Sequence, residues 1–186
     1  ALPKDRLRAL EKFVHSPYHV THNGVIQLFD LLKSNLSATE LDKKWLSRVY
    51  GENDGNLYKC TWPADLAYLG ENEATYKAIM NNPESRAYDL TTNETADDYT
   101  HLVDLIRTLN QPVDADYPAK ISAILNVESV LKAFALDVAT GNWDDYFVNK
   151  NNYFLYDNPI TGRFDFITFD TDNTFGVDWI SADWTK

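Results

Sequence analysis

The chain has 186 residues, of which 44% are hydrophobic and 24% are charged. This length and balance suit one globular domain with a buried core, and they exclude collagen-like, low-complexity and disordered chains. The formal net charge of −11 disfavours binding to the phosphate backbone of nucleic acids and to anionic lipid surfaces. We therefore expect neither a nucleic acid nor a membrane among the partners of this protein.

The only cysteine is Cys60. A single cysteine excludes an internal disulfide framework and a cysteine-rich zinc site, so we expect Cys60 to be a small buried side chain. No apolar run approaches the roughly 20 residues that a membrane-spanning helix requires.

The first part of the chain has the apolar spacing of helices. Apolar residues recur at helical intervals over residues 7–14 and again over 26–36. Residues 37–40 match a capping box and predict a helix that continues through residues 41–49. After a turn, residues 56–60 have the pattern of a short strand.

The middle of the chain is polar and rich in loops, but it contains two helical segments. Residues 95–98 place two acidic side chains at the start of the first helix, where they complement the helix dipole. Residues 110–112 end that helix with a proline. Its expected buried stripe consists of His101, Leu102, Leu105, Ile106 and Leu109.

The second helix of this region is expected to begin after Asn126, a typical N-cap residue, and to end at Gly141. Its expected core face consists of Val130, Leu131, Phe134, Ala135 and Val138.

The last third of the chain predicts a β-hairpin. Residues 152–156 and 163–169 have strand patterns, and residues 157–162 between them are typical of a turn. The sequence as a whole therefore predicts an α+β fold that is mostly helical and has a late β-hairpin.

Candidate chemistry gathers around this hairpin. A hairpin returns the chain to the end where it started, so Asp144 before it and Asp170 after it are expected within several ångströms of each other. A bend at Thr171 would let Asp170 and Asp172 converge on one hard cation, and Asn152 would add a neutral oxygen. Mg²⁺ prefers a few carboxylates together with water and substrate phosphates. The pattern therefore suits a nucleotide–metal site on the hairpin.

Two other interpretations fit the same spacing. Aspartates at helix ends and strand exits are often only turn formers or caps. The Asp170-Thr171-Asp172 pattern also occurs in metal-dependent glycosyltransferases, which bind a nucleotide diphosphate through a metal.

Several segments carry a resemblance to a known family. They are Gly-Asn-Trp-Asp at 141–144, Asn-Tyr-Phe-Leu-Tyr at 152–156 and Phe-Asp-Thr-Asp-Asn-Thr-Phe-Gly at 169–176, supported by Asn-Leu-Tyr-Lys at 56–59. Together they resemble the CotH family, spore-coat-H-type secreted kinases with an atypical protein-kinase-like fold. The resemblance extends from about residue 42 to residue 179, and its specific part is 141–176.

The resemblance implies one kinase-like domain over residues 1–186. Residues 1–60 would be helices and the remnant of an N-terminal lobe, which is incomplete, and residues 61–186 would be the catalytic and metal-binding part. The implied activity is phosphate transfer from ATP to serine or threonine of a protein substrate, with ATP and Mg²⁺ or Mn²⁺ as cofactors. The implied location is secreted, or at the cell or spore surface.

The resemblance also implies roles for individual residues. Asp144 would be the catalytic base that orients and deprotonates the acceptor hydroxyl. Asp170 would bind the metal, with Asp172 as a direct or outer ligand. Asn152 would hold a second metal or position Asp144. Lys59, on the predicted strand 56–60, is a further candidate, as a contact to the nucleotide phosphates.

Three alternatives stay open in the sequence. Asn149 follows Asp144 by five residues, the usual kinase spacing, and therefore competes with Asn152 as the metal ligand. Asp145 competes with Asp144 as the base. The seven glycines are scattered and form no glycine-rich phosphate loop. A catalytically weak or inactive binding or assembly module, such as a spore-coat scaffold or surface adhesin, is therefore the alternative function.

Overall fold

The computed structural model describes Lys12, His15 and residues 41–81 and 85–174. The chain forms two compact units, Ala1–Leu41 and Asp42–Lys186, and every helix and strand described below belongs to the second unit. The helices predicted over residues 7–14 and 26–36, and the capping box at 37–40, lie outside the described residues.

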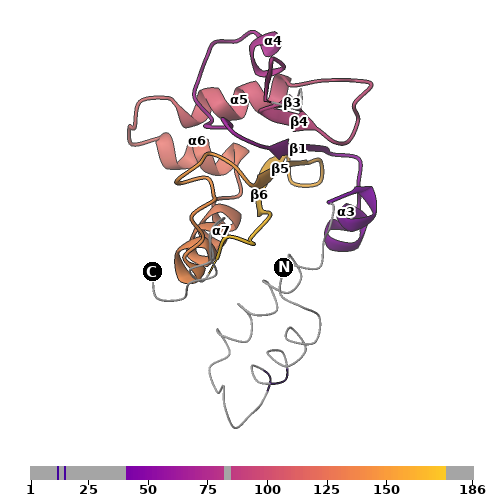
Figure 1. Cartoon of the computed structure of the whole chain (residues 1–186). Helices are drawn as coiled ribbons and strands as arrows, with labels where there is room; N and C mark the ends of the chain where they lie inside the picture. The colour runs from indigo at the N-terminus through magenta and orange to yellow at the C-terminus, as the bar shows by residue number, and fades with distance from the viewer. Residues whose placement is uncertain (1–11, 13–14, 16–40, 82–84, 175–186) are drawn as a thin grey trace. The chain divides into compact units, whose positions relative to one another are not determined.

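A four-stranded antiparallel sheet forms the centre of the second unit (Figure 1). Its strands, in spatial order, are β4 (Tyr88–Leu90), β1 (Asn56–Cys60), β5 (Tyr153–Asn158) and β6 (Arg163–Thr168). The predicted strand at 56–60 and the predicted hairpin are both confirmed. The sheet also contains a pairing that the local pattern did not reveal, because β1 lies directly against β5 although almost a hundred residues separate them.

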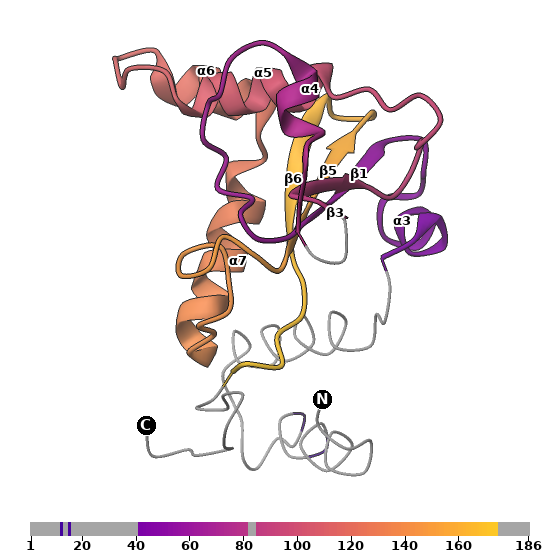
Figure 2. The same ribbon diagram turned by 45° about the horizontal axis from the view of Figure 1, so that its top comes forward.

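Five helices are present in the described residues: α3 (Lys43–Tyr50), α4 (Glu73–Tyr76), α5 (Thr100–Leu109), α6 (Tyr117–Ile124) and α7 (Val127–Thr140). Two short strands, β2 (Ile79–Asn81) and β3 (Ser85–Arg86), form a separate ribbon. Helices α5, α6 and α7 lie on one side of the four-stranded sheet, and α3 lies on the other (Figures 1 and 2). The described fold is therefore a mixed α and β fold.

Local signals explain where several of these helices begin and end. The carboxylate of Asp42 accepts the backbone N–H of Trp45 at 2.8 Å and caps α3. Asn126 caps α7 by accepting the N–H of Ser129, and Gly141 ends this helix in the left-handed conformation, as predicted. Helix α5 ends at Leu109, directly before the predicted stop.

The main core lies between the sheet and helices α5 to α7. Alternate residues of the strands point to this side, among them Tyr58, Leu155 and Phe166, which face one another across β1, β5 and β6. The rings of Tyr153 and Phe166 stack with their centroids 4.7 Å apart. Burial of each such large side chain stabilises the fold by about 1.5–3 kcal/mol, so the hairpin is a rigid base for the loops at its ends.

The predicted stripe of α5 is buried at its three central members and only partly buried at its ends, His101 and Leu109. Leu102, Leu105 and Ile106 are buried, whereas the side chain of His101 is 37% exposed. Nδ1 of His101 lies 2.8 Å from Oδ1 of Asp157 on β5. His101 is therefore half-buried at the rim of the core, where Asp157 on the neighbouring strand is its hydrogen-bond partner.

Helix α7 buries only part of the expected face: Val130 and Phe134 pack against the core, but the other three residues do not. Leu131 and Val138 are 63% and 77% exposed, and Ala135 is exposed as well. The buried face consists of Ala133, Leu136, Asp137 and Thr140. The predicted core face is therefore wrong for Leu131, Ala135 and Val138. Hydrogen bonds to nearby groups satisfy Asp137 and Thr140, so these polar side chains can be buried. The helix therefore packs this face against the rest of the fold, although the opposite stripe is more apolar.

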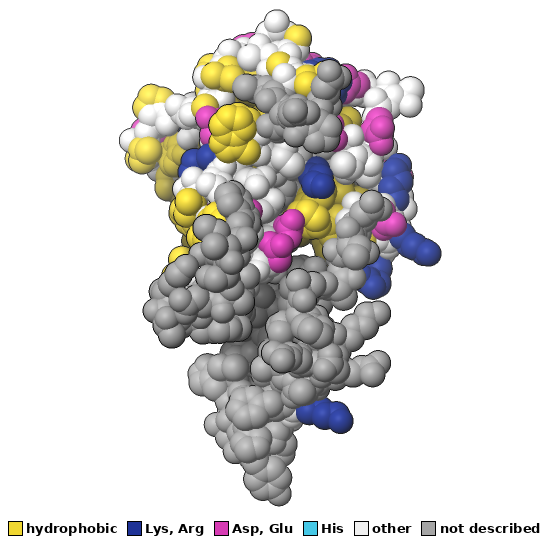
Figure 3. Space-filling model, in the orientation of Figure 1, with side chains coloured by type: hydrophobic (Ala, Val, Ile, Leu, Met, Phe, Trp, Pro, Cys, Tyr) yellow, Lys and Arg dark blue, Asp and Glu magenta, His cyan; other side chains and the backbone are white. Residues whose placement is uncertain are grey.

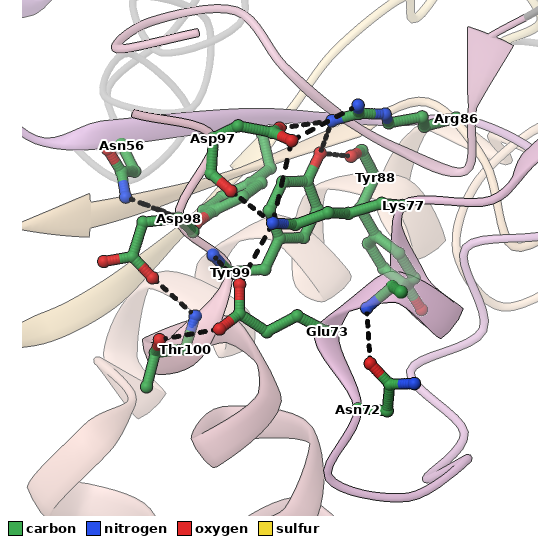
Figure 4. A network of polar contacts seen from close by, with 12 residues as sticks. Asn56, Asn72, Glu73, Lys77, Arg86, Tyr88, Asp97, Asp98, Tyr99 and Thr100 are labelled. Atoms are coloured by element: carbon green, nitrogen blue, oxygen red, sulfur yellow. Dashed lines mark hydrogen bonds and ion pairs between the residues drawn. The ribbon is translucent and has the colours of Figure 1, made fainter. Parts of the chain in front are cut away.

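A polar network joins α4 and β3 to the start of α5 (Figure 4). The carboxylate of Asp97 pairs with both Arg86 and Lys77, and Lys77 also pairs with Glu73 at 3.1 Å. Glu73 in turn accepts the backbone N–H of Tyr99 at 3.0 Å. The network therefore anchors the loop that leads into α5. Elsewhere on the surface, basic side chains gather on the side of α3 (Figure 3).

Candidate active site

Asp144 lies in the turn that follows α7. Asp144 is only 7% exposed, and its backbone N–H donates to Oδ1 of Asn142 at 3.3 Å. A buried carboxylate requires hydrogen-bond donors to offset its lost hydration. The carboxylate of Asp144 therefore needs donors from the residues around it.

Asparagine side chains supply these donors. Oδ1 of Asp144 accepts from Asn149 at 2.7 Å and from Asn151 at 3.4 Å. Oδ2 accepts from Asn152 at 2.9 Å and from Asn173 at 3.3 Å. We call these four residues the asparagine ring. Because each amide nitrogen faces Asp144, each amide oxygen is directed away from it, and that of Asn151 accepts a backbone N–H instead.

The asparagine ring joins two segments of the chain to the turn that carries Asp144. Asn149 and Asn151 belong to the loop before β5, and Asn152 directly precedes that strand in the left-handed conformation. Asn173 follows β6 and lies 29 positions beyond Asp144. The hairpin brings these segments together, since the backbone carbonyl of Asn152 accepts the N–H of Phe169 at 3.0 Å.

The segment after β6 alternates between buried and exposed residues. Thr171 and Asn173 are buried, whereas Asp170 and Asp172 are exposed. Asp170 adopts a positive φ of 51°, which bends the chain as it leaves the strand. Desolvation raises the pKa of Asp170, and the nearby carboxylates of Asp172 and Asp144 raise it further. The carboxylates of Asp144 and Asp172 are therefore both close to Asp170.

Lys59 lies on β1 on the sheet face opposite the main core. It is flanked across the strands by Asp89 and Phe154. Its Nζ lies 5.3 Å from the centroid of the Phe169 ring, and its charge lowers the pKa of Asp170. Lys59 is therefore a cation beside the exposed end of the site, where a phosphate group would need a positive charge.

The donors in this region suit a hard divalent cation. Two exposed carboxylates, Asp170 and Asp172, lie near Asp144, whose carboxylate accepts from the amide of Asn152, and water and phosphate oxygens normally complete the coordination of Mg²⁺. Among residues 41–81 and 85–174, no three His, Cys, Asp or Glu side chains form a group that could hold a metal by themselves. A metal bound here would therefore need oxygen ligands from water or phosphate in addition to these residues.

The structure brings together the predicted residues Asp144, Asn152, Asp170 and Asp172. It places both Asn149 and Asn152 on the Asp144 carboxylate, so the choice of metal ligand between them stays open. The carboxylate of Asp145 instead accepts the backbone N–H of Val148 at 2.9 Å. Asp144, not Asp145, is therefore the centre of the asparagine ring.

Sequence reasoning missed Asn151 and Asn173 as members of the site. Asn151 also accepts the backbone N–H of Trp62 at 3.2 Å and so connects the end of β1 to the ring. The signal for Asn173 was its place directly after Asp172 in the segment that follows the hairpin. Nothing in the local pattern pointed to Asn151.

No helix in the described part of the chain is both long and apolar enough to cross a membrane.

Comparison with known proteins identifies the family of this chain. The family model described as CotH kinase protein matches residues 35–186. The chain is also 32% identical over 143 residues to the inner spore coat protein H of Bacillus subtilis strain 168. This match covers 77% of the chain but only 37% of the length of that relative. The chain therefore belongs to the CotH family.

Proposed function

We propose that this chain carries the centre of an ATP- and divalent-metal-dependent kinase that phosphorylates serine or threonine of a protein substrate. The observation that carries the proposal is the asparagine ring around Asp144. It holds a buried carboxylate by donors from both sides of the hairpin. The exposed carboxylates of Asp170 and Asp172 and the cation of Lys59 lie close by.

In this proposal Asp144 accepts the hydrogen bond of the acceptor hydroxyl and takes its proton during transfer. The hydroxyl replaces one amide donor of the asparagine ring, and the remaining donors keep the carboxylate in place. Asp170, Asp172 and Asn152 or Asn149 hold a metal, which when bound neutralises phosphate charge.

Lys59 contacts a phosphate oxygen of the nucleotide. Most of the rate enhancement then comes from the positioning of the reactants and from compensation of charge. The family and the name of the coat-protein relative support a place at the spore or cell surface.

Transfer of labelled phosphate from ATP tests the proposal directly. The chain would be incubated with labelled ATP, Mg²⁺ or Mn²⁺ and a generic protein acceptor, beside Asp144→Asn and Asp145→Asn variants. Both substitutions remove one buried carboxylate from the same turn, but only the carboxylate of Asp144 accepts from the side chains of the asparagine ring. Asp145 contacts Asn149 and Asn151 through its backbone carbonyl, which the substitution keeps.

We expect transfer by the unchanged chain and by Asp145→Asn, and none by Asp144→Asn. Transfer that survives in Asp144→Asn would refute the role of this residue. An Asp170→Ala variant that keeps full activity would refute the metal assignment.

A specific observation also favours a binding or assembly role. Helix α7 exposes Leu131 and Val138, and Phe147 packs on Phe134 of the same helix with ring centroids 4.2 Å apart. Exposed apolar side chains mark protein interfaces where they form a contiguous patch.

Thermal unfolding with and without MgATP separates the two functions, because ligand at about a hundred times its Kd should stabilise the protein by about 2.7 kcal/mol. The absence of any shift at millimolar MgATP would favour the assembly role. A shift with a sugar nucleotide but not with ATP would instead indicate a glycosyltransferase.

A further inference from the structure

A second buried carboxylate lies just behind the candidate site. Asp137 is in the last turn of α7 and is only 3% exposed. Within the described part of the chain, no lysine or arginine forms an ion pair with it. Burial of an unpaired carboxylate is unfavourable, and an aliphatic side chain would fill a helix face of this kind without that penalty. Packing alone therefore does not explain why an aspartate occupies this buried position.

The explanation lies in the contacts of Asn142. Its Nδ2 donates to Oδ1 of Asp137 at 2.9 Å, and its Oδ1 accepts the backbone N–H of Asp144 at 3.3 Å. Its own backbone N–H donates to the carbonyl of Asp137 at 2.9 Å. Asn142 is thus fixed to the helix at two points and holds the backbone of Asp144 at a third.

The turn after α7 brings Asn142 close to both Asp137 and Asp144. Gly141 reverses the chain in the left-handed conformation, so Asn142 folds back over the last turn of α7. Asn142 is itself buried, and the short path from Asp137 through Asn142 to Asp144 contains no exposed side chain. A rigid helix, and not a mobile loop, therefore sets the position of the Asp144 backbone.

From these contacts we propose that Asp137 and Asn142 are positioning residues that orient Asp144 for phosphoryl transfer. Asp137 supplies a hydrogen-bond acceptor at a fixed point of α7, and Asn142 transmits that position to Asp144. The inference rests on the proposed kinase function for its kinetic consequences. Its structural part concerns the asparagine ring and does not depend on turnover.

Two substitutions of Asp137 separate positioning from packing. Asp137→Asn keeps an oxygen that can accept from Asn142, whereas Asp137→Leu keeps the approximate volume but removes the acceptor. The matched control is Thr140→Val, because Thr140 is a buried neighbour on the same turn whose hydroxyl bonds only to carbonyls of α7. Circular dichroism would first establish that each variant is folded.

Kinetics of phosphate transfer provide the first readout. Displacement of a catalytic group by about 1 Å can reduce turnover roughly a hundredfold, so we expect kcat of Asp137→Leu to fall about 10- to 100-fold. We expect KM for ATP to change less than twofold, since the nucleotide side of the site is untouched. Asp137→Asn and Thr140→Val should keep kcat within about threefold. Equal losses in Asp137→Leu and Thr140→Val would overturn the proposal.

Side-chain amide NMR provides a readout that needs no activity. The NH₂ resonances of Asn149 and Asn152 report their hydrogen bonds to Asp144, and we expect them to shift in Asp137→Leu but not in Thr140→Val. If the unchanged chain transfers no phosphate but the resonances shift as expected, the kinase proposal fails and the positioning link stands. Unshifted resonances in Asp137→Leu would overturn the positioning link itself.

Discussion

Replacement of Asp137 by asparagine should stabilise this protein at neutral pH. Burial raises the pKa of Asp137 from 3.8 to about 6, the hydrogen bond from Asn142 opposes this rise, and the charge of Asp145 adds to it. A carboxyl with a raised pKa favours the folded state when protonated. Its contribution is fully present below pH 3.8 and is lost as the pH rises to about 6.

The size of the effect follows from the shift. About two pKa units at about 1.36 kcal/mol each set an upper limit near 3 kcal/mol. Asparagine is neutral at every pH, so Asp137→Asn avoids this loss above pH 6 and should raise the free energy of unfolding there by about 1–3 kcal/mol. Near pH 3.5 the two proteins should have nearly equal stability.

Urea unfolding followed by tryptophan fluorescence at pH 3.5 and 7.5 measures this difference. The exposed Asp114→Asn serves as the control, because Asp114 pairs with Lys120 at the surface and its loss should not stabilise the protein at pH 7.5. A variant that is no more stable than the unchanged chain at pH 7.5 would refute the reasoning. So would an equal difference in stability at the two pH values.

Four further perturbations test other parts of the fold. Gly55→Ala should destabilise the protein severely, because its Cβ would lie 2.2 Å from the carbonyl oxygen of Asp157; calorimetry would measure the fall in Tm. Thr168→Val should stabilise by about 1 kcal/mol in urea unfolding, since among the described residues no partner bonds the buried hydroxyl of Thr168. The hydrogen bond to Asp157 raises the pKa of His101, so this interaction stabilises the fold below pH 6.5, and the stabilisation is lost as the pH rises through the pKa of the folded state. Asp157→Asn should lower the pKa of His101 in an NMR titration, and an unchanged titration would contradict this explanation. The hydrogen bond from Arg86 lowers the pKa of Asp97, so the stabilisation by this ion pair is present above pH 3.8 and is lost at lower pH. Asp97→Asn should therefore lower the free energy of unfolding by at most about 1 kcal/mol at pH 7, and by less in 1 M salt. A loss that does not change with salt would contradict this explanation.

Part of the candidate site could be predicted from the order of residues along the chain. A hairpin must return to its starting end, so the proximity of Asp144 and Asp170 follows from strand signals alone. The asparagine ring could not be predicted in this way. The bond between Asn173 and Asp144 spans 29 positions and depends on how the chain bends at Asp170.

The burial of α7 shows the same limit. Periodicity favoured the stripe with Leu131 and Val138, since both stripes of the helix have helical spacing and this one is more apolar. The helix instead buries Asp137 and Thr140, whose polar groups are satisfied by Asn142 and by the helix itself. The spacing of apolar residues contains no information that the carboxylate of Asp137 has a hydrogen-bond partner, Asn142, five residues further along the chain.

The sequence by itself determined the local elements whose signals are complete within a few residues. These are the strand that begins at Asn56, the hairpin, and the ends of α7 at Asn126 and Gly141. Only the tertiary structure decided the pairing of β1 with β5, the buried face of α7 and the donors around Asp144. The physical reason is that hydrogen bonds and close packing form between side chains that the fold brings together, and local propensity contains no information about such distant partners.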